Sequence, residues 1–275
     1  MDQFKQAVNL ARGAAPLAPS AAYEPLGDRP HPIDSGSSLQ EVRIKNFPLK
    51  AAHLESMRIV AHNKDDLRSR SFDMLRTQVL QSMDNSGWQF LAVTSPTAGC
   101  GKTVTACNLA LSIARLLERS VLLVDLDMRK PKVADYLGIK RDFGLLSVLQ
   151  GRQNLSDAIV QVGIEREQLL VLPGEHTNAS SEWMASPTMA TLLQTIKREF
   201  RSRIVILDLP PILTGDDVIS VLPHLESILL VAGAGSSSVS DIKECSKHLK
   251  ATPVVRMVVN KITEREPTAP YHEYY

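Results

Sequence analysis

The sequence predicts an α/β protein with a doubly wound, mostly parallel sheet. Short runs of Val, Leu and Ile alternate with stretches of helical periodicity across residues 61–262. Helices cover both faces of a parallel sheet, so its strands read as almost continuous apolar runs. Three of these runs end in polar segments, and the carboxyl ends of such strands form the edge at which ligands bind.

Each predicted element follows from this alternation. Before the first strand, apolar residues recur at helical spacing from Asp65 to Met83, which indicates an amphipathic helix. The apolar runs predict strands at Gln89–Thr94, Val121–Asp125, Leu169–Leu172, Ile204–Asp208, Ser227–Ala232 and Val254–Asn260. The stretches between them predict helices at Lys102–Glu118, Leu145–Leu149, Asp157–Val162, Thr188–Arg201, Asp216–Leu222 and Ser238–Leu249.

Both ends of the chain depart from the pattern. Residues 1–60 are rich in proline, with Ala, Ser and Gly between the prolines, and this composition indicates a mobile arm. Residues 263–275 predict a flexible, solvated tail. Three of the 5 tyrosines, Tyr271, Tyr274 and Tyr275, stand in the last five positions of that tail. An aromatic plug that docks the terminus on the core is the alternative interpretation.

Composition narrows the class of partner. With 31 basic and 30 acidic residues, the chain has no bulk charge that would attract nucleic acid or an anionic membrane. Its 3 cysteines are too few and too scattered for a disulfide framework or a zinc site. The apolar runs are shorter than the roughly 20 residues that span a bilayer. We therefore expect a cytoplasmic protein whose membrane association comes from a partner.

The turn after the first predicted strand has the features of a phosphate-binding loop, or P-loop. Glycines let backbone amides converge on phosphate oxygens, Lys102 neutralises the outer phosphates, and the Thr103 hydroxyl is placed to ligate magnesium. Pro96 stands where the usual spacing has Gly or Ala, so the loop must enter through an ordinary turn. A plain strand-to-helix turn is the alternative. The residues expected to contact the nucleotide are Gly99, Cys100, Gly101, Lys102, Thr103 and Val104.

Two further strands end in carboxylates. Asp208 ends one of them, where a carboxylate can hold magnesium through water. Asp125 and Asp127 follow another, and their alternate spacing directs both side chains to one face. A helix cap at the strand exit is the alternative for this pair. Together with the P-loop, these carboxylates predict a site for ATP and Mg²⁺ that supports phosphoryl transfer.

With these motifs, residues 65–275 resemble the bacterial tyrosine kinases that regulate capsule and exopolysaccharide assembly. The resemblance implies that Asp125 takes the tyrosine proton, that Asp127 and Asp208 support magnesium, and that Asn260 contacts adenine. It also implies that the tail tyrosines accept phosphate. The segments that carry the resemblance are Thr94–Thr103, Val121–Pro131, Ile206–Pro211, Val259–Asn260 and the tyrosines of the tail.

The family also implies partners. Its catalytic domain is either fused to a membrane chain-length (co-polymerase) protein or separate from it, and this chain resembles the separate form. A cytoplasmic segment of that membrane protein would then activate the kinase at the inner face of the plasma membrane.

Three positions, Arg70, Asp73 and Gly233, depart from the family's pattern. The family joins subunits in a ring through an acidic-x-x-Arg-x-x-Arg signature, and the equivalent positions here hold Arg70, Asp73 and Arg76. Only Arg76 fits, although an exchanged Arg70 and Asp73 pair would still allow a homo-oligomer. Gly233 stands where the family often has Arg.

Two other functions fit the same sequence. One is a noncatalytic, nucleotide-gated regulator of polysaccharide assembly, which the changed residues on the helix and at Gly233 would allow. The other is an ATPase of the kind that positions chromosomes and septa. Those ATPases carry an extra lysine five residues before the P-loop lysine, and Thr97 stands there in this chain.

Overall fold

The computed structural model describes residues 45–116, 118–140, 143–164 and 169–262. Within these ranges, no helix combines the length and the apolar character needed to cross a bilayer. All of the predicted strands are present, and two more are found, one at the start of the described residues and one before Leu169. The strands are β1 (Lys45–Pro48), β2 (Phe90–Thr94), β3 (Val121–Asp125), β4 (Val160–Gly163), β5 (Leu169–Leu172), β6 (Ile204–Asp208), β7 (Ser227–Gly233) and β8 (Val254–Asn260).

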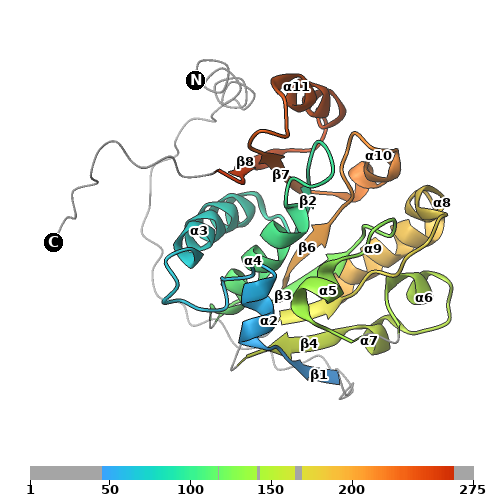
Figure 1. Cartoon of the computed structure of the whole chain (residues 1–275). Helices are drawn as coiled ribbons and strands as arrows, with labels where there is room; N and C mark the ends of the chain where they lie inside the picture. Colours follow the sequence, from blue (N-terminus) through green and yellow to red (C-terminus); the bar gives the residue numbers. More distant parts are fainter. Residues whose placement is uncertain (1–44, 117, 141–142, 165–168, 263–275) are drawn as a thin grey trace, which may run out of the picture. The chain divides into compact units, whose positions relative to one another are not determined.

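The strands form one 8-stranded sheet in the order β1-β4-β5-β3-β6-β2-β7-β8 (Figure 1). Every neighbouring pair is parallel except β4 and β5, which are antiparallel. The helices around it are α2 (Ala51–Ser56), α3 (Ser69–Ser86), α4 (Lys102–Ala114), α5 (Val133–Leu137), α6 (Leu145–Leu149), α7 (Leu155–Ala158), α8 (Ser180–Met184), α9 (Pro187–Glu199), α10 (Asp217–Val221) and α11 (Val239–His248).

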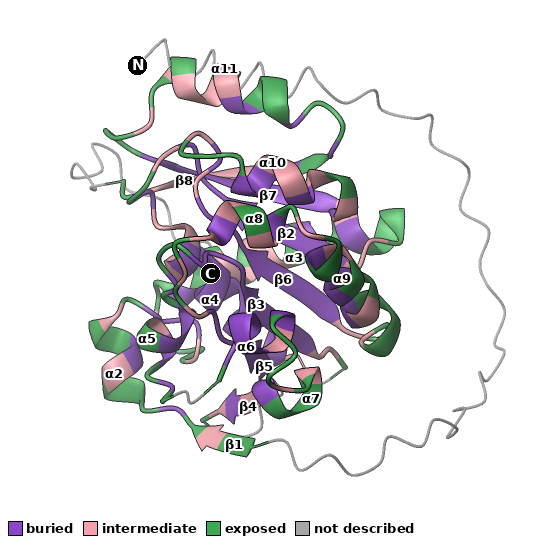
Figure 2. Cartoon of the chain, turned by 90° about the vertical axis from the view of Figure 1, so that its right-hand side faces the viewer, coloured by how far each residue is buried: buried purple, intermediate pink, exposed green. Residues whose placement is uncertain are grey.

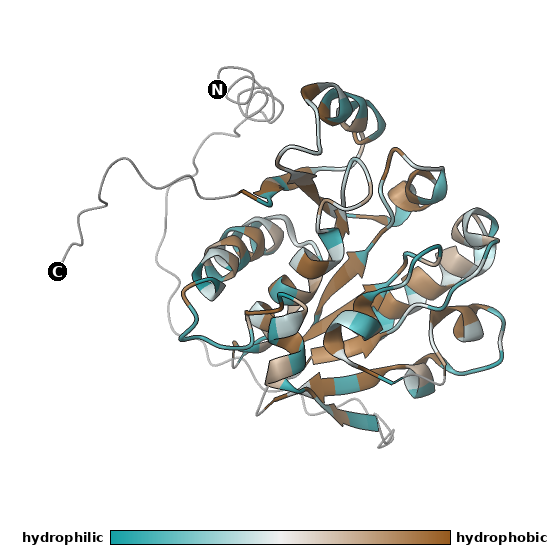
Figure 3. Ribbon diagram, in the orientation of Figure 1, coloured by the Kyte–Doolittle hydropathy of each residue, from teal (hydrophilic) through white to brown (hydrophobic). Residues whose placement is uncertain are grey.

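Two hydrophobic cores lie on the two faces of the sheet. In β2, Leu91 and Val93 belong to the core beneath α3 and α4, while Phe90 and Ala92 belong to the core beneath α9 and α10. The central strands are buried along their whole length, and the outer surfaces of the helices are hydrophilic (Figures 2 and 3). Helices on both faces of a mostly parallel sheet confirm the predicted doubly wound α/β fold.

The helix predicted over Asp157–Val162 is wrong. The chain forms the short helix α7 and then extends into β4, which pairs antiparallel with β5. Ile159, Val160 and Val162 are β-branched residues, which pack better on a pleated surface than on a helix. Val162 is fully buried, so burial between β1 and β5 decides the conformation.

The boundary predicted at residue 60 is also wrong. Residues 45–60 form β1 and α2, and Leu54 and Ile59 are fully buried in the core beneath α4. The Asn108 carboxamide of α4 fixes the end of this stretch, because its oxygen accepts hydrogen bonds from the amides of Val60 and Ala61 at 2.8 and 2.9 Å. The folded domain therefore includes residues 45–60. The rest of the predicted arm and the tail at 263–275 lie outside the described residues.

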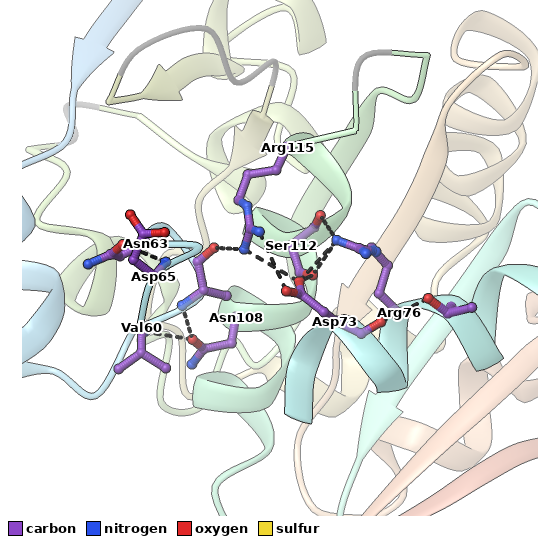
Figure 4. A network of polar contacts seen from close by, with 10 residues as sticks. Val60, Asn63, Asp65, Asp73, Arg76, Asn108, Ser112 and Arg115 are labelled. Atoms are coloured by element: carbon purple, nitrogen blue, oxygen red, sulfur yellow. Dashed lines mark hydrogen bonds and ion pairs between the residues drawn. The ribbon is translucent and has the colours of Figure 1, made fainter. Parts of the chain in front are cut away.

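Asp73 joins α3 to the P-loop helix α4 within one subunit (Figure 4). Its Oδ1 accepts hydrogen bonds from the Ser112 hydroxyl at 2.6 Å and from Arg76 Nη1 at 3.0 Å, and Arg115 Nη1 lies 3.4 Å away. Arg76 also donates to the Ser112 carbonyl at 3.0 Å. This network ties α3 to α4 within the subunit, while the Asp73 side chain stays 26% exposed.

Replacing Asp73 by Asn is expected to lower the free energy of unfolding by about 1–3 kcal/mol, because the charged acceptor of a partly buried network is lost. Asp84→Asn is the matched control on the same helix. Its pair with Arg119 is exposed on both sides, at 46% and 39%, and such pairs contribute about 0–1 kcal/mol. Urea unfolding of the two variants measures the difference; equal midpoints would contradict a stabilising role for the Asp73 network.

Candidate nucleotide and metal site

Three adjacent central strands bring the predicted site residues together. β6 lies between β3 and β2, and Asp208 at its end is in register with Asp125 on one side and with Val93 on the other. The P-loop follows β2, and Asp127 follows β3. All of the carboxylates predicted for the site therefore stand at the same edge of the sheet as Lys102.

The P-loop needs glycine at two positions. Gly99 and Gly101 have φ of +81° and +92°, a region that residues with a side chain rarely adopt. At Gly101 a Cβ atom would also collide with the Asn260 side chain, whose Nδ2 donates to the Cys100 carbonyl at 3.1 Å. The entry through Pro96 is ordinary, and the Pro96 carbonyl accepts a hydrogen bond from the amide of Leu213 at 3.1 Å.

Gly101→Ala is expected to weaken nucleotide binding about tenfold or more, because strain and the displaced Asn260 together exceed the ~1.4 kcal/mol that a factor of ten represents. Gly87→Ala is the control, since φ is +66° there and a Cβ atom would meet open space. The control should lose stability and keep its affinity in a fluorescence titration with a labelled ADP. Unchanged affinity in Gly101→Ala would contradict the crowding at Asn260.

Lys102 is held by two carboxylates. Its Nζ lies 2.8 Å from Asp127 Oδ2 and 3.6 Å from Asp208 Oδ1, and its side chain is 11% exposed. Burial alone would lower the pKa of Lys102, but the Asp208 and Asp127 carboxylates outweigh it and hold that pKa above its ordinary value. The ammonium group is therefore charged, and it also lies 3.3 Å from the Thr103 hydroxyl.

Asp208 keeps one oxygen without a hydrogen-bond partner. Its Oδ2 accepts the Thr103 hydroxyl at 2.7 Å, while Oδ1 is buried and has only the distant contact with Lys102. Burial raises the pKa of Asp208 above its ordinary value, although Lys102 and Thr103 favour the charged form. A buried anionic oxygen beside a threonine hydroxyl suits a hard cation such as magnesium, directly or through water.

Protein side chains alone would not complete such a metal site. Among the described residues, no group of three or more His, Cys, Asp or Glu side chains is arranged to hold a metal. Magnesium commonly uses one or two protein ligands together with phosphate oxygens and water. The residues present therefore fit a magnesium ion that arrives with a nucleotide.

Asp125 is fully buried, and it is in register with Asp208 on the neighbouring strand. Burial, followed by repulsion from Asp208, raises the pKa of Asp125 to about 7. Three backbone amides donate to its carboxylate, from Asp127 at 3.1 Å and from Lys132 and Val133 at 3.0 Å each. The structure thus brings Asp125 to the site, with its side chain directed into the loop that follows β3.

The segment after β7 closes the other side of the P-loop. The Cys100 thiol lies 3.4 Å from the Ser237 hydroxyl, which in turn accepts a hydrogen bond from the Gly233 amide at 3.0 Å. A Cβ atom at Gly233 would collide with the Ser236 hydroxyl and lie 3.4 Å from Cys100 Cα, so the backbone at Gly233 packs closely against the P-loop. Val104, in the first turn of α4, is half-buried and its carbonyl accepts from Asn108 at 2.8 Å.

Sequence reasoning assigned no role to Arg129, which lies two residues after Asp127. Its Nε donates to Asp217 at 2.9 Å and its Nη2 donates to the Ser181 hydroxyl at 2.7 Å. Although burial would raise the pKa of Asp217, the bond from Arg129 holds it below its ordinary value. Arg129 thus ties the loop after β3 to α8 and α10. Its place in the motif was visible, but its partners lie 52 and 88 positions away.

Comparisons with known proteins identify the relatives of this chain. The family model described as the CobQ/CobB/MinD/ParA nucleotide binding domain matches residues 91–274. The chain is 31% identical over 226 residues to EpsB of Ralstonia nicotianae, a candidate tyrosine-protein kinase, and 26% identical over 223 residues to the tyrosine-protein kinase wzc of Salmonella typhi. Each match covers 80% of this chain, but only 29% of EpsB and 30% of wzc.

A solved structure has the same fold. The kinase domain of the Escherichia coli tyrosine kinase ETK superposes with a TM-score of 0.65 at 24% identity, covering 75% of this chain and 80% of that domain. The two chains therefore share the same overall fold.

Proposed function

The chain belongs to the CobQ/CobB/MinD/ParA nucleotide-binding family and, within it, to the bacterial tyrosine kinases, and on that basis we propose that it is an ATP-dependent protein-tyrosine kinase. Its acceptors include Tyr271, Tyr274 and Tyr275 of its own tail. Its role is to regulate the assembly and export of an exopolysaccharide or capsule polymer.

One observation carries this proposal: the Lys102 ammonium, the Thr103 hydroxyl and the carboxylates of Asp127 and Asp208 meet at one point above the P-loop. Lys102 would bind the outer phosphates, and the loop amides would orient the phosphate chain. Thr103, Asp127 and Asp208 would hold magnesium. Magnesium would neutralise charge on the transferring group. The adenine base would lie near Asn260 and Val104.

Proton removal from the tyrosine needs no strong base. A phenol with a pKa near 10 and Asp125, whose pKa burial raises to about 7, differ by about 3 units, which opposes early transfer by roughly 4 kcal/mol. The proton therefore leaves late, when the phenol oxygen has already bonded to phosphorus. Alignment and positive charge, supplied by Lys102 and the loop amides, account for most of the catalysis.

The tail has the reach to deliver a tyrosine to this site. Asn260 at the end of β8 contacts Cys100 of the P-loop, so the tail departs from the neighbourhood of the nucleotide. Thirteen extended residues beyond Ile262 span on the order of 40 Å. Both transfer within a subunit and transfer between subunits are therefore compatible with this length.

Mass spectrometry of the purified full chain with ATP and Mg²⁺ tests the proposal. We expect phosphate on Tyr271, Tyr274 or Tyr275, and none after Lys102→Met. Phosphate release from ATP that continues when all three tyrosines are replaced by Phe, without any phosphotyrosine, would identify a positioning-type ATPase instead. Nucleotide binding with neither product would identify a noncatalytic regulator.

We also propose that a cytoplasmic segment of a membrane chain-length protein recruits and activates this chain. The support is the family membership, because the chain matches less than a third of the length of its relatives EpsB and wzc. Phosphorylation rates and membrane co-sedimentation, measured with and without that protein, decide the question. Equal values in both preparations would refute the proposal, and light scattering would determine whether the chain forms a homo-oligomer.

A further inference from the structure

Arg129 holds the middle of the loop that follows β3. Its Nε donates to Asp217 Oδ2 at 2.9 Å, its Nη2 lies 2.9 Å from the same oxygen, and Nη2 also donates to the Ser181 hydroxyl at 2.7 Å. Asp217 is the first residue of α10 and Ser181 lies in α8, two helices that lie side by side (Figure 1). The planar guanidinium offers its donors in a fixed fork, so one side chain binds two helices at once.

The acceptors of Arg129 are themselves held in place. Asp217 is buried, with 2% of its surface exposed. The Ser181 hydroxyl donates to Asp216 Oδ1 at 2.7 Å. A Cβ atom at Gly215 would lie 2.9 Å from Asp217 Oδ2 and 3.3 Å from Arg129 Nη2, so the backbone there packs against the ion pair. Because this stretch belongs to the segment after β6, Arg129 joins the segments that follow two acidic strands, β3 and β6.

The backbone around Arg129 is bound from a third side. The Met128 carbonyl accepts a hydrogen bond from the Thr177 amide at 3.0 Å, and the Arg129 carbonyl oxygen lies 2.9 Å from His176 Nδ1. Both partners lie in the loop after β5. The segments that follow β5 and β6 therefore meet at Arg129, and a movement of the loop after β3 would break contacts to both.

Asp127 stands two residues before Arg129, in the same turn. The Lys130 amide closes this turn, because it donates to the Asp127 carbonyl and to Asp127 Oδ1, at 3.1 Å each. The other carboxylate oxygen, Oδ2, lies 2.8 Å from Lys102 Nζ. The orientation of the Asp127 carboxylate therefore depends on where the turn 127–130 is held, and Arg129 is the charged side chain that ties this turn to α8 and α10.

We propose that Arg129 is a positioning residue for phosphoryl transfer: by binding Asp217, it fixes the turn 127–130 so that the Asp127 carboxylate stays beside Lys102 and supports magnesium bound with the nucleotide. This inference rests on the proposed kinase function. It assigns to Arg129 a role in metal affinity that is separate from binding of the nucleotide itself. Lysine keeps the charge, but its single ammonium group lacks the fork that reaches Asp217 and Ser181 together.

Nucleotide affinity measured with and without metal tests this role. A fluorescent ADP analogue is titrated in Mg²⁺ and in EDTA against the wild type, Arg129→Gln, Asp217→Asn and their double variant, with Asp127→Asn as the reference for a lost metal support. In Arg129→Gln the gain in affinity that Mg²⁺ gives should fall by about tenfold, as is typical when the support of a metal ligand is removed. Affinity in EDTA should stay within about twofold of the wild type, because the P-loop itself is unchanged.

The ion-pair partner and a control sharpen the test. Asp217→Asn should show the same loss, and the double variant should be no worse than either single variant, because the two side chains act as one unit. Arg129→Lys leaves Asp217 with a cation, so it should show a smaller loss, and it replaces Arg129→Gln if that variant does not fold. The matched control is Arg119→Gln, because this arginine also pairs with a carboxylate but at an exposed place, and it should respond to Mg²⁺ as the wild type does.

The outcomes separate the possible failures. A wild-type response to Mg²⁺ in Arg129→Gln, together with a loss in Asp127→Asn, would overturn the positioning role. An equal loss in EDTA and in Mg²⁺ would overturn it in favour of a general folding role. A wild-type response in Asp127→Asn would instead contradict the metal role assigned to Asp127 under the proposed function, and the inference about Arg129 would fail with it.

Hydrogen exchange of the metal-free protein gives an independent readout. In Arg129→Gln the amides of Lys130 and Thr177 should exchange about tenfold faster, because the turn that supplies their acceptors loses its anchor. Arg119→Gln should leave both amides unchanged. Unchanged exchange in Arg129→Gln would refute the anchoring role whatever the activity of the variant.

Discussion

Lys102→Met is expected to lower tyrosine phosphorylation by about 10³-fold, because a preorganised charge at the transferring phosphate is lost in a site from which water is excluded. Lys102 is well placed for this role. It is 11% exposed, lies between Asp127 and Asp208 and begins the P-loop helix α4. Steady-state rates with ATP and a tail peptide measure the effect.

Lys102→Met should also be less stable than the wild type, because Lys102 has a structural role as well as a catalytic one. Without the ammonium group, two buried carboxylates lose their cation, and breaking such a pair costs about 3 kcal/mol. Adding Asp127→Asn to Lys102→Met should recover much of that stability without recovering activity. If the double variant were as unstable as the single one, Asp127 would not be the partner that makes Lys102 necessary for folding.

Asp208→Asn should have the opposite effect on stability. Phosphorylation should fall by about 10²–10³-fold, since the buried oxygen that suits magnesium becomes part of a neutral amide. The melting temperature should rise, because the pKa of Asp208 is raised by burial. A raised pKa means that at neutral pH the folded state holds the ionised carboxylate less favourably than the unfolded chain does.

The hydrogen bond from the Thr103 hydroxyl should survive the Asp208→Asn substitution. The carboxamide oxygen that Asp208→Asn introduces can still accept the Thr103 hydroxyl, so the P-loop helix should remain in place. Differential scanning calorimetry without metal, combined with rates over a range of Mg²⁺ concentrations, tests both effects. A fall in melting temperature together with normal magnesium dependence would show that Asp208 is a structural residue and not part of the metal position.

The sheet and the convergence of the site could be predicted from the sequence, because both follow from local patterns. The apolar runs predicted the central strands. Because parallel strands present their carboxyl ends at one edge of the sheet, the sequence also predicted that Asp125 and Asp208 lie together. Lys102 and Thr103 followed from the glycine spacing. These features need no knowledge of how distant segments pack.

The features that sequence reasoning missed depend on distant partners. β4 forms a strand because it pairs with β5. The end of the segment 45–60 is held by Asn108, on a helix predicted separately, which accepts hydrogen bonds from the backbone there. Asp125 shows the same limit. Its spacing from Asp127 predicts that both side chains share one face, whereas the chain turns after β3 and wraps its amides around Asp125.

The pairing of β1 with β4 bears on how this domain can be produced in shortened form. A fragment that begins at residue 61 would lack β1, so β4 would become the outermost strand of the sheet. It would also lack Leu54 and Ile59, which cover the side of α4. In the intact domain the outermost strand is β1, a short strand that carries Lys45 and Pro48, and these features protect a sheet edge. The newly exposed edge of β4 would recruit strands from other chains, so the shorter fragment should self-associate, whereas one that begins before Lys45 should stay dispersed.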